Sequence, residues 1–324
     1  MTIHELRIKL DIEDPTDVLN AIAKKCINNN WLFVDSNDGQ CYLFDTNGKE
    51  KDIDELTTIH ESIFCNDQTL TKIIIPSSVK SISEEAFFAC NGLMNVTIGN
   101  GVTNIEYGAF ACCHRLTSVT IPNSVTRIGY GAFWDCSRLT SVHITDLAKW
   151  CSISFDGSST NPLSYAHNLY LNGKKVTELT IPNNVTNIGD YAFYNCNSLT
   201  SVMIPDNVTN IGTHAFYSCT RLVDVTIGNG VTSIGTHAFY SCDNFASVTI
   251  PDSVTSIGLG AFRDCIGLKS VTIGNNVTSI GEHAFRFCSQ LKSLFFKGKT
   301  LAQIKAMKNY PFGIEDESII RCEV

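Results

Sequence analysis

The sequence predicts a β-rich α/β repeat solenoid, in which short coils stack on one another between a small N-terminal α/β cap and a C-terminal cap. Three observations predict it. A unit of 23 residues recurs through most of the chain. The first segment of each unit alternates apolar with polar residues, as a half-buried strand does. Both ends of the chain depart from the unit, as the terminal segments of stacked repeats do.

Residues 1–46 form the first predicted part, a small α/β head. The stretch LRIKLDI (6–12) predicts a strand, and DPTDVLNAIAKKCINN (14–29) predicts a helix with Asp14 as its N-cap and Pro15 at its first position. The stretches NWLFV and CYLF predict two more strands, joined by the turn SNDGQ. Two roles are open for this head: an N-terminal cap of the array, or a docking or oligomerisation module.

Residues 47–296 form the predicted array, with the unit L-x-x-V-x-I-[PG]-x-x-V-x-x-I-G-x-x-A-F-x-x-C-x-x. A degenerate first repeat occupies residues 47–69, and an irregular longer repeat occupies residues 139–175, where the spacing is 37 instead of 23 residues. The regular units begin at Leu70, Leu93, Leu116, Leu139, Val176, Leu199, Leu222, Phe245, Leu268 and Leu291.

The unit at residues 116–138 shows what one coil contains. Val119 and Ile121 alternate with polar residues and predict a strand, V-x-x-I predicts a short extended piece, and the spacing of A-F-x-x-C suits a helical turn. The turn position held by Gly101 or Ser124 is expected to be left-handed in some copies. One coil cannot offset the entropy of ordering its own backbone, so we expect the coils to stack and share one apolar interior.

The unit LTSVTIPNSVTRIGYGAFWDCSR (116–138) resembles the BspA-like leucine-rich repeats, the class-5 repeat of bacterial surface proteins. The resemblance covers about residues 57–296, because V-T-x-I-G and A-F-x-x-C recur there in register. The ending KGKTLAQIKAMKNYPFGIEDESII looks like a closing segment seen after such arrays. This resemblance implies a right-handed leucine-rich-repeat superhelix and, typically, surface adhesion or protein binding. It implies no catalysis.

Residues 297–324 are predicted to cap the C-terminal end. Thr300 and Gln303 in TLAQIKAM match a capping box at the start of a helix. Leu301, Ile304 and Met307 would then face the last coil.

Composition limits the partners and leaves the location open. The chain has no apolar run of the length that crosses a membrane, and its net charge of −8 comes without a basic stripe, which argues against nucleic acid. The first residues lack the basic and apolar regions of a secretory signal. The protein is therefore expected to be cytoplasmic, to be exported by another route, or to be missing its leader. The resemblance instead implies the cell surface or secretion.

Cysteines and histidines recur in register, but we expect no metal or cofactor. Eight cysteines follow the core Phe by three residues, where buried thiols are favoured over disulfides, although stacked neighbours at about 5 Å do not exclude pairing. His214, His237 and His283 share another position and are predicted to form an exposed polar ladder. The register cysteines are Cys90, Cys113, Cys136, Cys196, Cys219, Cys242, Cys265 and Cys288.

Signatures of enzymes are missing from the sequence, which contains no H-E-x-x-H, G-x-S-x-G, phosphate loop or dinucleotide fingerprint. Only the irregular segment 145–175 mixes different chemical groups, and a structural insertion is favoured there over a catalytic site. The polar and aromatic residues of that segment are Asp146, Lys149, Trp150, Asp156, Tyr165 and His167.

Two surfaces are candidates for binding a partner. The outward position of the strands holds Thr97, Thr120, His143, Thr180, Met203, Thr226, Thr249 and Thr272. This face either offers hydroxyls to a long ligand or only stabilises the strands. The position after the core Phe holds Trp134, Tyr194, Tyr217 and Tyr240, which either bind a sugar or protein partner or pack on one another.

The function predicted from these observations is a non-catalytic, adhesin-like binding module that presents a repetitive surface to a protein or glycan, including host surface or matrix components. The alternative is a structural or assembly component, a scaffold that docks through residues 1–46. An enzyme is disfavoured, because a ladder repeats one group in rows and an active site needs different groups to converge.

Overall fold

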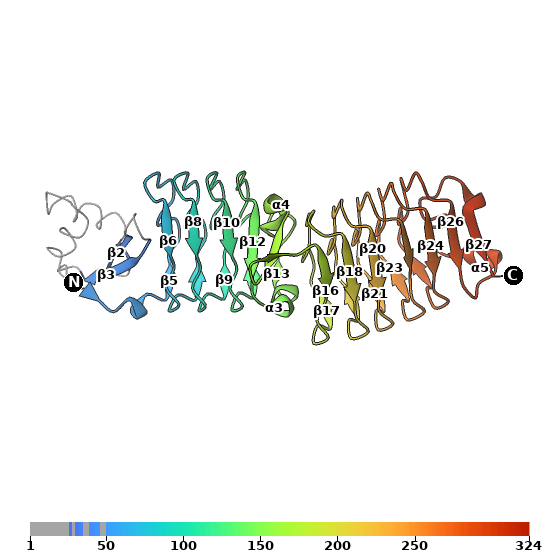
Figure 1. The fold of residues 1–324 in the computed structure, drawn as a ribbon, viewed down its shortest axis with the longest axis horizontal. Helices are drawn as coiled ribbons and strands as arrows, with labels where there is room; N and C mark the ends of the chain where they lie inside the picture. The colour runs from blue at the N-terminus through green and yellow to red at the C-terminus, as the bar shows by residue number, and fades with distance from the viewer. Residues whose placement is uncertain (1–25, 28–29, 35–38, 46–49, 324) are drawn as a thin grey trace. The chain divides into compact units, whose positions relative to one another are not determined.

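The computed structural model describes the chain except for residues 1–25, 28–29, 35–38, 46–49 and 324. The chain divides into two compact units, Met1–His143 and Ile144–Val324. The division falls inside the predicted array, at the irregular repeat. Each unit is a stack of β-coils, so the predicted solenoid is confirmed within each of them (Figure 1).

In the first unit, each coil contributes one strand to each of two parallel sheets. One sheet contains β6 (Lys72–Ile74), β8 (Asn95–Thr97), β10 (Ser118–Thr120) and β12 (Ser141–Ile144). The other contains β5 (Thr58–Ile59), β7 (Ser81–Ile82), β9 (Asn104–Ile105) and β11 (Arg127–Ile128). Val119 pairs with Val96 on one side and Val142 on the other, so the register is that of the repeat.

The second unit repeats this plan with one interruption. Its shorter strands form one sheet: β17 (Asn187–Ile188), β19 (Asn210–Ile211), β21 (Ser233–Ile234), β23 (Ser256–Ile257) and β25 (Ser279–Ile280). The longer strands form two sheets. The first contains β16 (Glu178–Thr180), β18 (Ser201–Ile204) and β20 (Asp224–Ile227). The second contains β22 (Ser247–Thr249), β24 (Ser270–Ile273), β26 (Ser293–Phe296) and β27 (Ile320–Cys322). The interruption lies between β20 and β22, which belong to different sheets. The unit after the interruption begins with Phe245 in place of Leu or Val, and its ring contacts those of Phe239 and Phe262.

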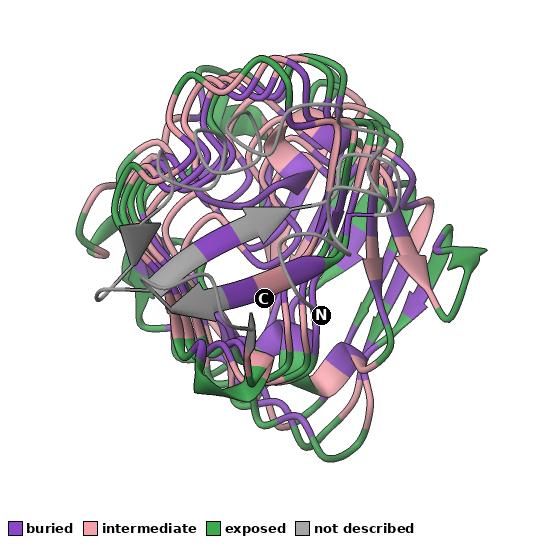
Figure 2. Cartoon of the chain, turned by 90° about the vertical axis from the view of Figure 1, so that its left-hand side faces the viewer, coloured by how far each residue is buried: buried purple, intermediate pink, exposed green. Residues whose placement is uncertain are grey.

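The interior of the coils is apolar, and its largest component is a column of stacked phenylalanines. Within the first unit Phe87 and Phe110 have ring centroids 5.0 Å apart, and within the second Phe216 and Phe239 lie 5.2 Å apart. Figure 2 shows buried residues lining the inside of the coils and exposed residues at their turns. The spacing of the rings follows the spacing of the strands, about 4.8 Å, so the backbone ladder and the ring column support each other.

The A-F-x-x-C segment is not a helical turn, so that expectation was wrong. Each copy contains turns closed by bonds over three residues, and two positive-φ residues interrupt them, as at Gly131 (φ 66) and Asp135 (φ 55). This conformation points alternate backbone groups at the next coil, so that the Phe110 N–H donates to the Ala132 carbonyl at 2.8 Å. The left-handed turn expected in some copies at the position of Gly101 and Ser124 is also wrong, because no described copy of this position has a positive φ.

The register cysteines are buried free thiols, as predicted. The Sγ of Cys113 donates to the carbonyl of Phe87, in the coil before it, at 3.2 Å. Burial raises the pKa of Cys136 to about 12, so its thiol keeps the proton that it donates to Phe110. The same bond recurs at Cys90, Cys219, Cys242, Cys265 and Cys288. A core Phe followed by Cys is therefore a packing and hydrogen-bonding pair that joins neighbouring coils.

The described part of residues 1–46 covers one edge of the first unit. Here β2 (Asn30–Val34) and β3 (Cys41–Asp45) pair antiparallel, as the sequence predicts, and β4 (Glu50–Lys51) extends their sheet. The Gly39 carbonyl accepts from the Ile74 N–H of edge strand β6 at 2.7 Å, which supports the cap interpretation. The strand expected at 6–12 and most of the helix expected at 14–29 lie outside the described residues. The end of that helix is wrong, because Cys26–Ile27 forms strand β1.

The irregular segment of the second unit packs against the first regular coil of that unit. It contains α3 (Leu147–Cys151), β13 (Ser154–Phe155), α4 (Leu163–Ala166), β14 (Leu169–Leu171) and β15 (Lys174–Lys175). Trp150 Nε1 donates to the Ala192 carbonyl at 2.8 Å, and Asn161 Nδ2 donates to the Tyr191 and Ala192 carbonyls at 2.8 and 3.1 Å. In a regular coil, the carbonyl at the Ala192 position accepts from a backbone N–H of the preceding coil, as Ala132 accepts from Phe110. At Ala192, side chains of the insertion supply these donors instead.

The C-terminal residues close the second unit with a helix and one more strand. Thr300 and Gln303 form the predicted capping box at α5 (Leu301–Lys305). Ile304 is buried as predicted, but Leu301 is exposed, so its expected contact with the last coil is wrong. After the 3₁₀ turn Glu317–Ile319, β27 pairs in parallel with β26 and extends the ladder.

Candidate partner-binding surfaces

An exposed aromatic cluster lies on the turns of the first unit. Tyr107, Tyr130 and Trp134 are 48%, 58% and 51% exposed, and the rings of Tyr107 and Tyr130 stack with their centroids 6.3 Å apart. With Phe88, Glu85, Gly108, Ala111 and Gly131 they line a hollow of about 320 Å³. We call this the aromatic hollow. Its lining is mostly apolar, with the Glu85 carboxylate as its charged group.

Two glycines leave the aromatic hollow open. Gly108 (φ 59) and Gly131 (φ 66) occupy a left-handed position that recurs in every regular coil. In the second unit Gly260 also holds that position, but the other coils carry Tyr191, His214, His237 and His283 there, and the rings of the first three pack on one another. Because glycine has no side chain, the rings of Tyr107, Tyr130 and Trp134 keep their faces accessible.

Sequence reasoning missed Tyr107 and Tyr130, although they are one repeat of 23 residues apart. It grouped Trp134 with Tyr194, Tyr217 and Tyr240. Trp134 belongs to the first unit. The three tyrosines stack on one another in the second unit, at 4.7 Å for both successive pairs. The tyrosines therefore pack on one another with half-buried rings, and a binding role for them stays a prediction.

Tyr191, His214 and His237 form a second ring column beside the tyrosine stack. The rings of Tyr191 and His214 are 4.9 Å apart and nearly parallel, and those of His214 and His237 are also 4.9 Å apart. Burial, followed by the neighbouring His237, lowers the pKa of His214 from 6.5 to about 4. The expectation of an exposed histidine ladder is wrong for these two residues, which are half-buried against aromatic rings.

Acid is expected to destabilise the second unit through His214. The folded-state pKa is depressed, so its contribution to stability is present above pH 6.5 and is lost as the pH falls toward about 4. His214→Asn removes this contribution while keeping a residue that tolerates positive φ. Urea midpoints measured across this range should fall less steeply for the variant than for the wild type. Tyr217→Phe, which keeps the ring stack and every imidazole, is the control, and equal slopes for His214→Asn and wild type would refute the prediction.

The threonine face lies where the sequence places it. Thr97, Thr120, Thr180, Thr226 and Thr249 are exposed, and His143 and Thr272 are half-buried at the same strand position. Where the ladder is interrupted between β20 and β22, Thr226 and Thr249 line a hollow of about 360 Å³ together with Asp224, Asp252 and Lys297. Neither of the two roles considered for this face is tested by its geometry.

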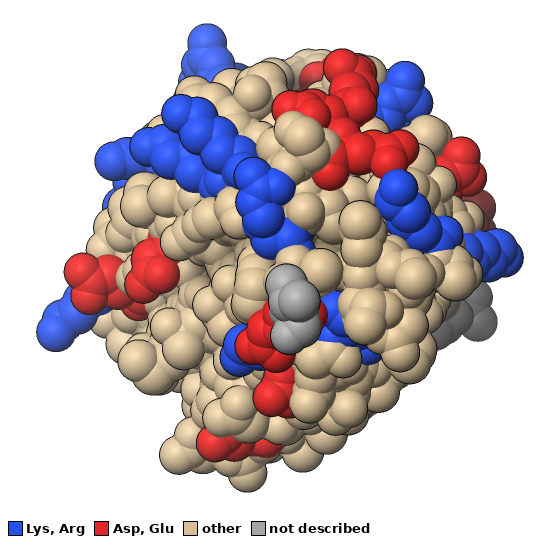
Figure 3. All heavy atoms as spheres, turned by 90° about the vertical axis from the view of Figure 1, so that its right-hand side faces the viewer, with Lys and Arg blue, Asp and Glu red and all other residues tan. Residues whose placement is uncertain are grey.

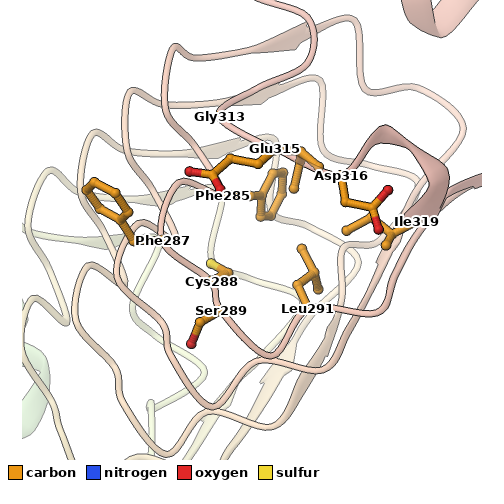
Figure 4. A pocket seen from close by; sticks show the side chains of 10 residues that line it. Phe285, Phe287, Cys288, Ser289, Leu291, Gly313, Glu315, Asp316 and Ile319 are labelled. Carbon is orange, nitrogen blue, oxygen red and sulfur yellow. The ribbon is translucent and has the colours of Figure 1, made fainter.

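Another hollow, of about 260 Å³, lies between the last coil and the closing segment of the second unit. Figure 4 shows its lining, which includes the apolar side chains of Phe285, Phe287, Leu291 and Ile319 and the carboxylates of Glu315 and Asp316. On the face drawn in Figure 3, basic and acidic side chains form separate small groups between large uncharged areas. Such a face differs from the continuous basic surface typical of nucleic-acid binding.

One cluster of possible metal ligands exists among the described residues: Cys112, His114 and Asp135, whose donor atoms lie within 4.8 Å of one another. Sequence reasoning missed it, because it considered only the register cysteines, and Cys112 is not one of them. The signal lay across coils, since Cys112 and Asp135 occupy the same repeat position.

Comparison with known proteins identifies the repeat. A family model described as a BspA type leucine rich repeat region matches residues 57–171 and 164–292, in six copies. No curated protein matches the chain. None of the helices found among the described residues has the length and apolar character of a membrane span.

Several solved structures are similar to this chain. A leucine rich repeat protein of T. pallidum is 35% identical, over 37% of this chain and 58% of its own, with a TM-score of 0.36. The pneumococcal vaccine antigen PcpA is 24% identical, over 72% of this chain and 58% of its own, with a TM-score of 0.51. A leucine rich cell surface protein of Faecalibacterium prausnitzii is 22% identical, over 88% of this chain and 97% of its own, with a TM-score of 0.48. The likeness to PcpA supports the fold.

Proposed function

Because the chain belongs to the BspA-type leucine-rich repeat family, we propose that it is a non-catalytic, adhesin-like binding module whose aromatic hollow takes a protein partner. Leucine-rich repeat solenoids are generally non-catalytic and typically bind proteins. The partner would place an apolar side chain or a short apolar segment against the rings of Tyr107, Tyr130 and Trp134.

The exposure of three neighbouring aromatic rings is the observation that carries this proposal. Each ring is about half exposed, whereas the stacked core phenylalanines are buried and the tyrosine stack of the second unit is half-buried. Tyr and Trp are the residue types most enriched where protein–protein binding energy concentrates, because they offer a large rigid area with little rotamer entropy to lose. Covering these rings would remove apolar surface from water, which favours association.

The shape and charge of the hollow favour a protein over a long polar chain. Its lining is mostly apolar and Glu85 supplies its one charged group, so a partner with an apolar anchor and a basic residue nearby would complement it. The backbone of the hollow is rigid, since each coil donates hydrogen bonds to the next, as from Cys112 N–H to the Trp134 carbonyl at 2.7 Å. Binding a partner therefore adds little entropic cost for ordering the backbone.

The test compares a Tyr107→Ala/Tyr130→Ala/Trp134→Ala variant with wild type for binding to immobilised fibronectin, laminin and collagen, and on a glycan array. We expect saturable binding of wild type to a matrix protein, weakened more than about tenfold in the variant, since loss of one aromatic anchor alone costs about 2 kcal/mol. Thr97→Ala/Thr120→Ala, on the strand face of the same unit, is the matched control and should bind like wild type.

Three outcomes would refute the proposal. Equal binding by the triple variant would exclude the hollow, and loss in the threonine control would assign binding to the strand face. Binding to glycans alone would replace the protein partner with a carbohydrate. Unchanged melting temperatures are expected for both variants, because all five substituted side chains are exposed.

The second predicted role, a scaffold that docks through residues 1–46, stays a prediction. Deletion of these residues would abolish defined oligomers if that role is correct.

A further inference from the structure

Cys112, His114 and Asp135 bring three different donor atoms to one place on the first unit. Cys112 and Asp135 hold the same repeat position in successive coils, and His114 follows Cys112 by two residues. A thiol sulfur, an imidazole nitrogen and a carboxylate oxygen thus lie within 4.8 Å of one another. All three side chains are half-buried, which leaves a path for an ion and room for water.

The backbone holds the three residues in place. Cys112 (φ 58) and Asp135 (φ 55) both occupy the left-handed position before the core cysteine. The Cys112 N–H donates to the Trp134 carbonyl at 2.7 Å, and the His114 N–H donates to the Cys112 carbonyl at 2.9 Å. His114 Nδ1 lies 3.0 Å from the Asp135 carbonyl, which keeps the ring beside the next coil. The arrangement therefore needs no folding of a loop around an ion.

We propose that Cys112, His114 and Asp135 bind a zinc-class divalent transition-metal ion, with water completing the coordination. Sulfur, nitrogen and oxygen from these residue types are the ligands that Zn²⁺ takes in proteins, and three protein ligands with an open fourth position form a recognised zinc geometry. A thiolate and an imidazole select against Mg²⁺ and Ca²⁺, which prefer oxygen ligands alone.

The distances suit closure around such an ion. In tetrahedral coordination, zinc bonds of about 2.0–2.3 Å place two ligand atoms about 3.3–3.7 Å apart. The donor atoms here lie within 4.8 Å of one another, so side-chain rotations that move them by about 1 Å would close the site. A bound ion would then join the side chains of two successive coils and stabilise the folded first unit by mass action.

The chain offers its own conservative variants for the test. The position of Cys112 and Asp135 holds Ser218 and Asn195 in other coils, and the position of His114 holds Asn197. Cys112→Ser, Asp135→Asn and His114→Asn should therefore fold like wild type. Cys65→Ser removes another half-buried free thiol of the same unit and is the matched control.

The experiment titrates the full chain, freed of metal and reduced, with Zn²⁺ by calorimetry and with Co²⁺ by absorption spectroscopy. Wild type should bind one ion per chain, and its cobalt form should show a thiolate-to-cobalt charge-transfer band. Cys112→Ser should abolish that band, and each ligand variant should weaken zinc binding by more than about 100-fold, beyond the 10–100-fold loss that an outer-shell partner causes.

Cys65→Ser should match wild type in both titrations. A charge-transfer band that persists in Cys112→Ser, or that disappears in Cys65→Ser, would overturn the proposal. Zinc affinity that is equal in wild type and all three ligand variants would overturn it as well. None of these readouts depends on the aromatic hollow, so the outcome is separate from that of the proposed function.

Discussion

Phe216→Ala is expected to lower the free energy of unfolding of the second unit by about 3–5 kcal/mol, the range for truncating a fully buried aromatic residue. The Phe216 side chain is 0% exposed, and its ring stacks on Phe193 at 5.1 Å and on Phe239 at 5.2 Å. The substitution leaves a cavity in a continuous column. The coils on both sides cannot collapse into it, because their spacing is set by the backbone ladder.

Urea unfolding followed by circular dichroism measures this effect. Trp134→Ala is the control, because it removes a larger ring from an exposed position of the first unit and should change stability by less than about 0.5 kcal/mol. If Phe216→Ala cost no more than Trp134→Ala, the ring column would not stabilise the stack as described.

Trp150→Ala is expected to cost about as much as Phe216→Ala, about 3–5 kcal/mol, for two reasons. The side chain is 1% exposed and packs edge-on against Phe155 with ring centroids 5.4 Å apart. Its Nε1 also donates to the Ala192 carbonyl, at the junction where the insertion meets the first regular coil of the second unit. The substitution thus adds the loss of a buried hydrogen bond to the loss of packing.

Trp150→Phe separates these two contributions in the same urea titration. It keeps most of the ring volume and removes only the donor, and Asn161 still donates to the Ala192 carbonyl. We expect it to cost about 1 kcal/mol. A Trp150→Ala protein as stable as wild type would contradict the structural role assigned to the insertion.

The repeat pattern was sufficient to predict the fold of one coil and its interior. The alternation around Val119 identified the strand, and the spacing of Phe133 and Cys136 identified the core ring and the buried thiol. Packing within the stack alone determines the residue types at these positions. The capping box at Thr300 was equally readable, since it depends on local hydrogen bonds. Such features depend either on residues that are close in the sequence or on residues that lie one 23-residue repeat apart.

The sequence could not predict features that depend on contacts between coils and override local preference. Asp135, His214 and Tyr191 adopt a positive φ although they are not glycines. The backbone hydrogen bonds to the next coil require that conformation. The same limit explains the missed site. Tyr107 and Tyr130 occupy a position that varies from copy to copy, and only the neighbouring glycines, which leave their ring faces open, make them a surface.

The backbone hydrogen bonds between successive coils affect how such a chain can gain or lose repeats during evolution. Phe110 N–H donates to Ala132 in the same way as Phe216 N–H donates to Ala238, so each regular coil offers its neighbour an identical edge. A gene segment encoding one whole coil can be duplicated or deleted in frame, and the joint is then filled by the same donors and acceptors as before. Loss or gain of a few codons lacks this property, because it shifts every side chain out of its column, and repair then needs substitutes of the kind that Trp150 and Asn161 provide.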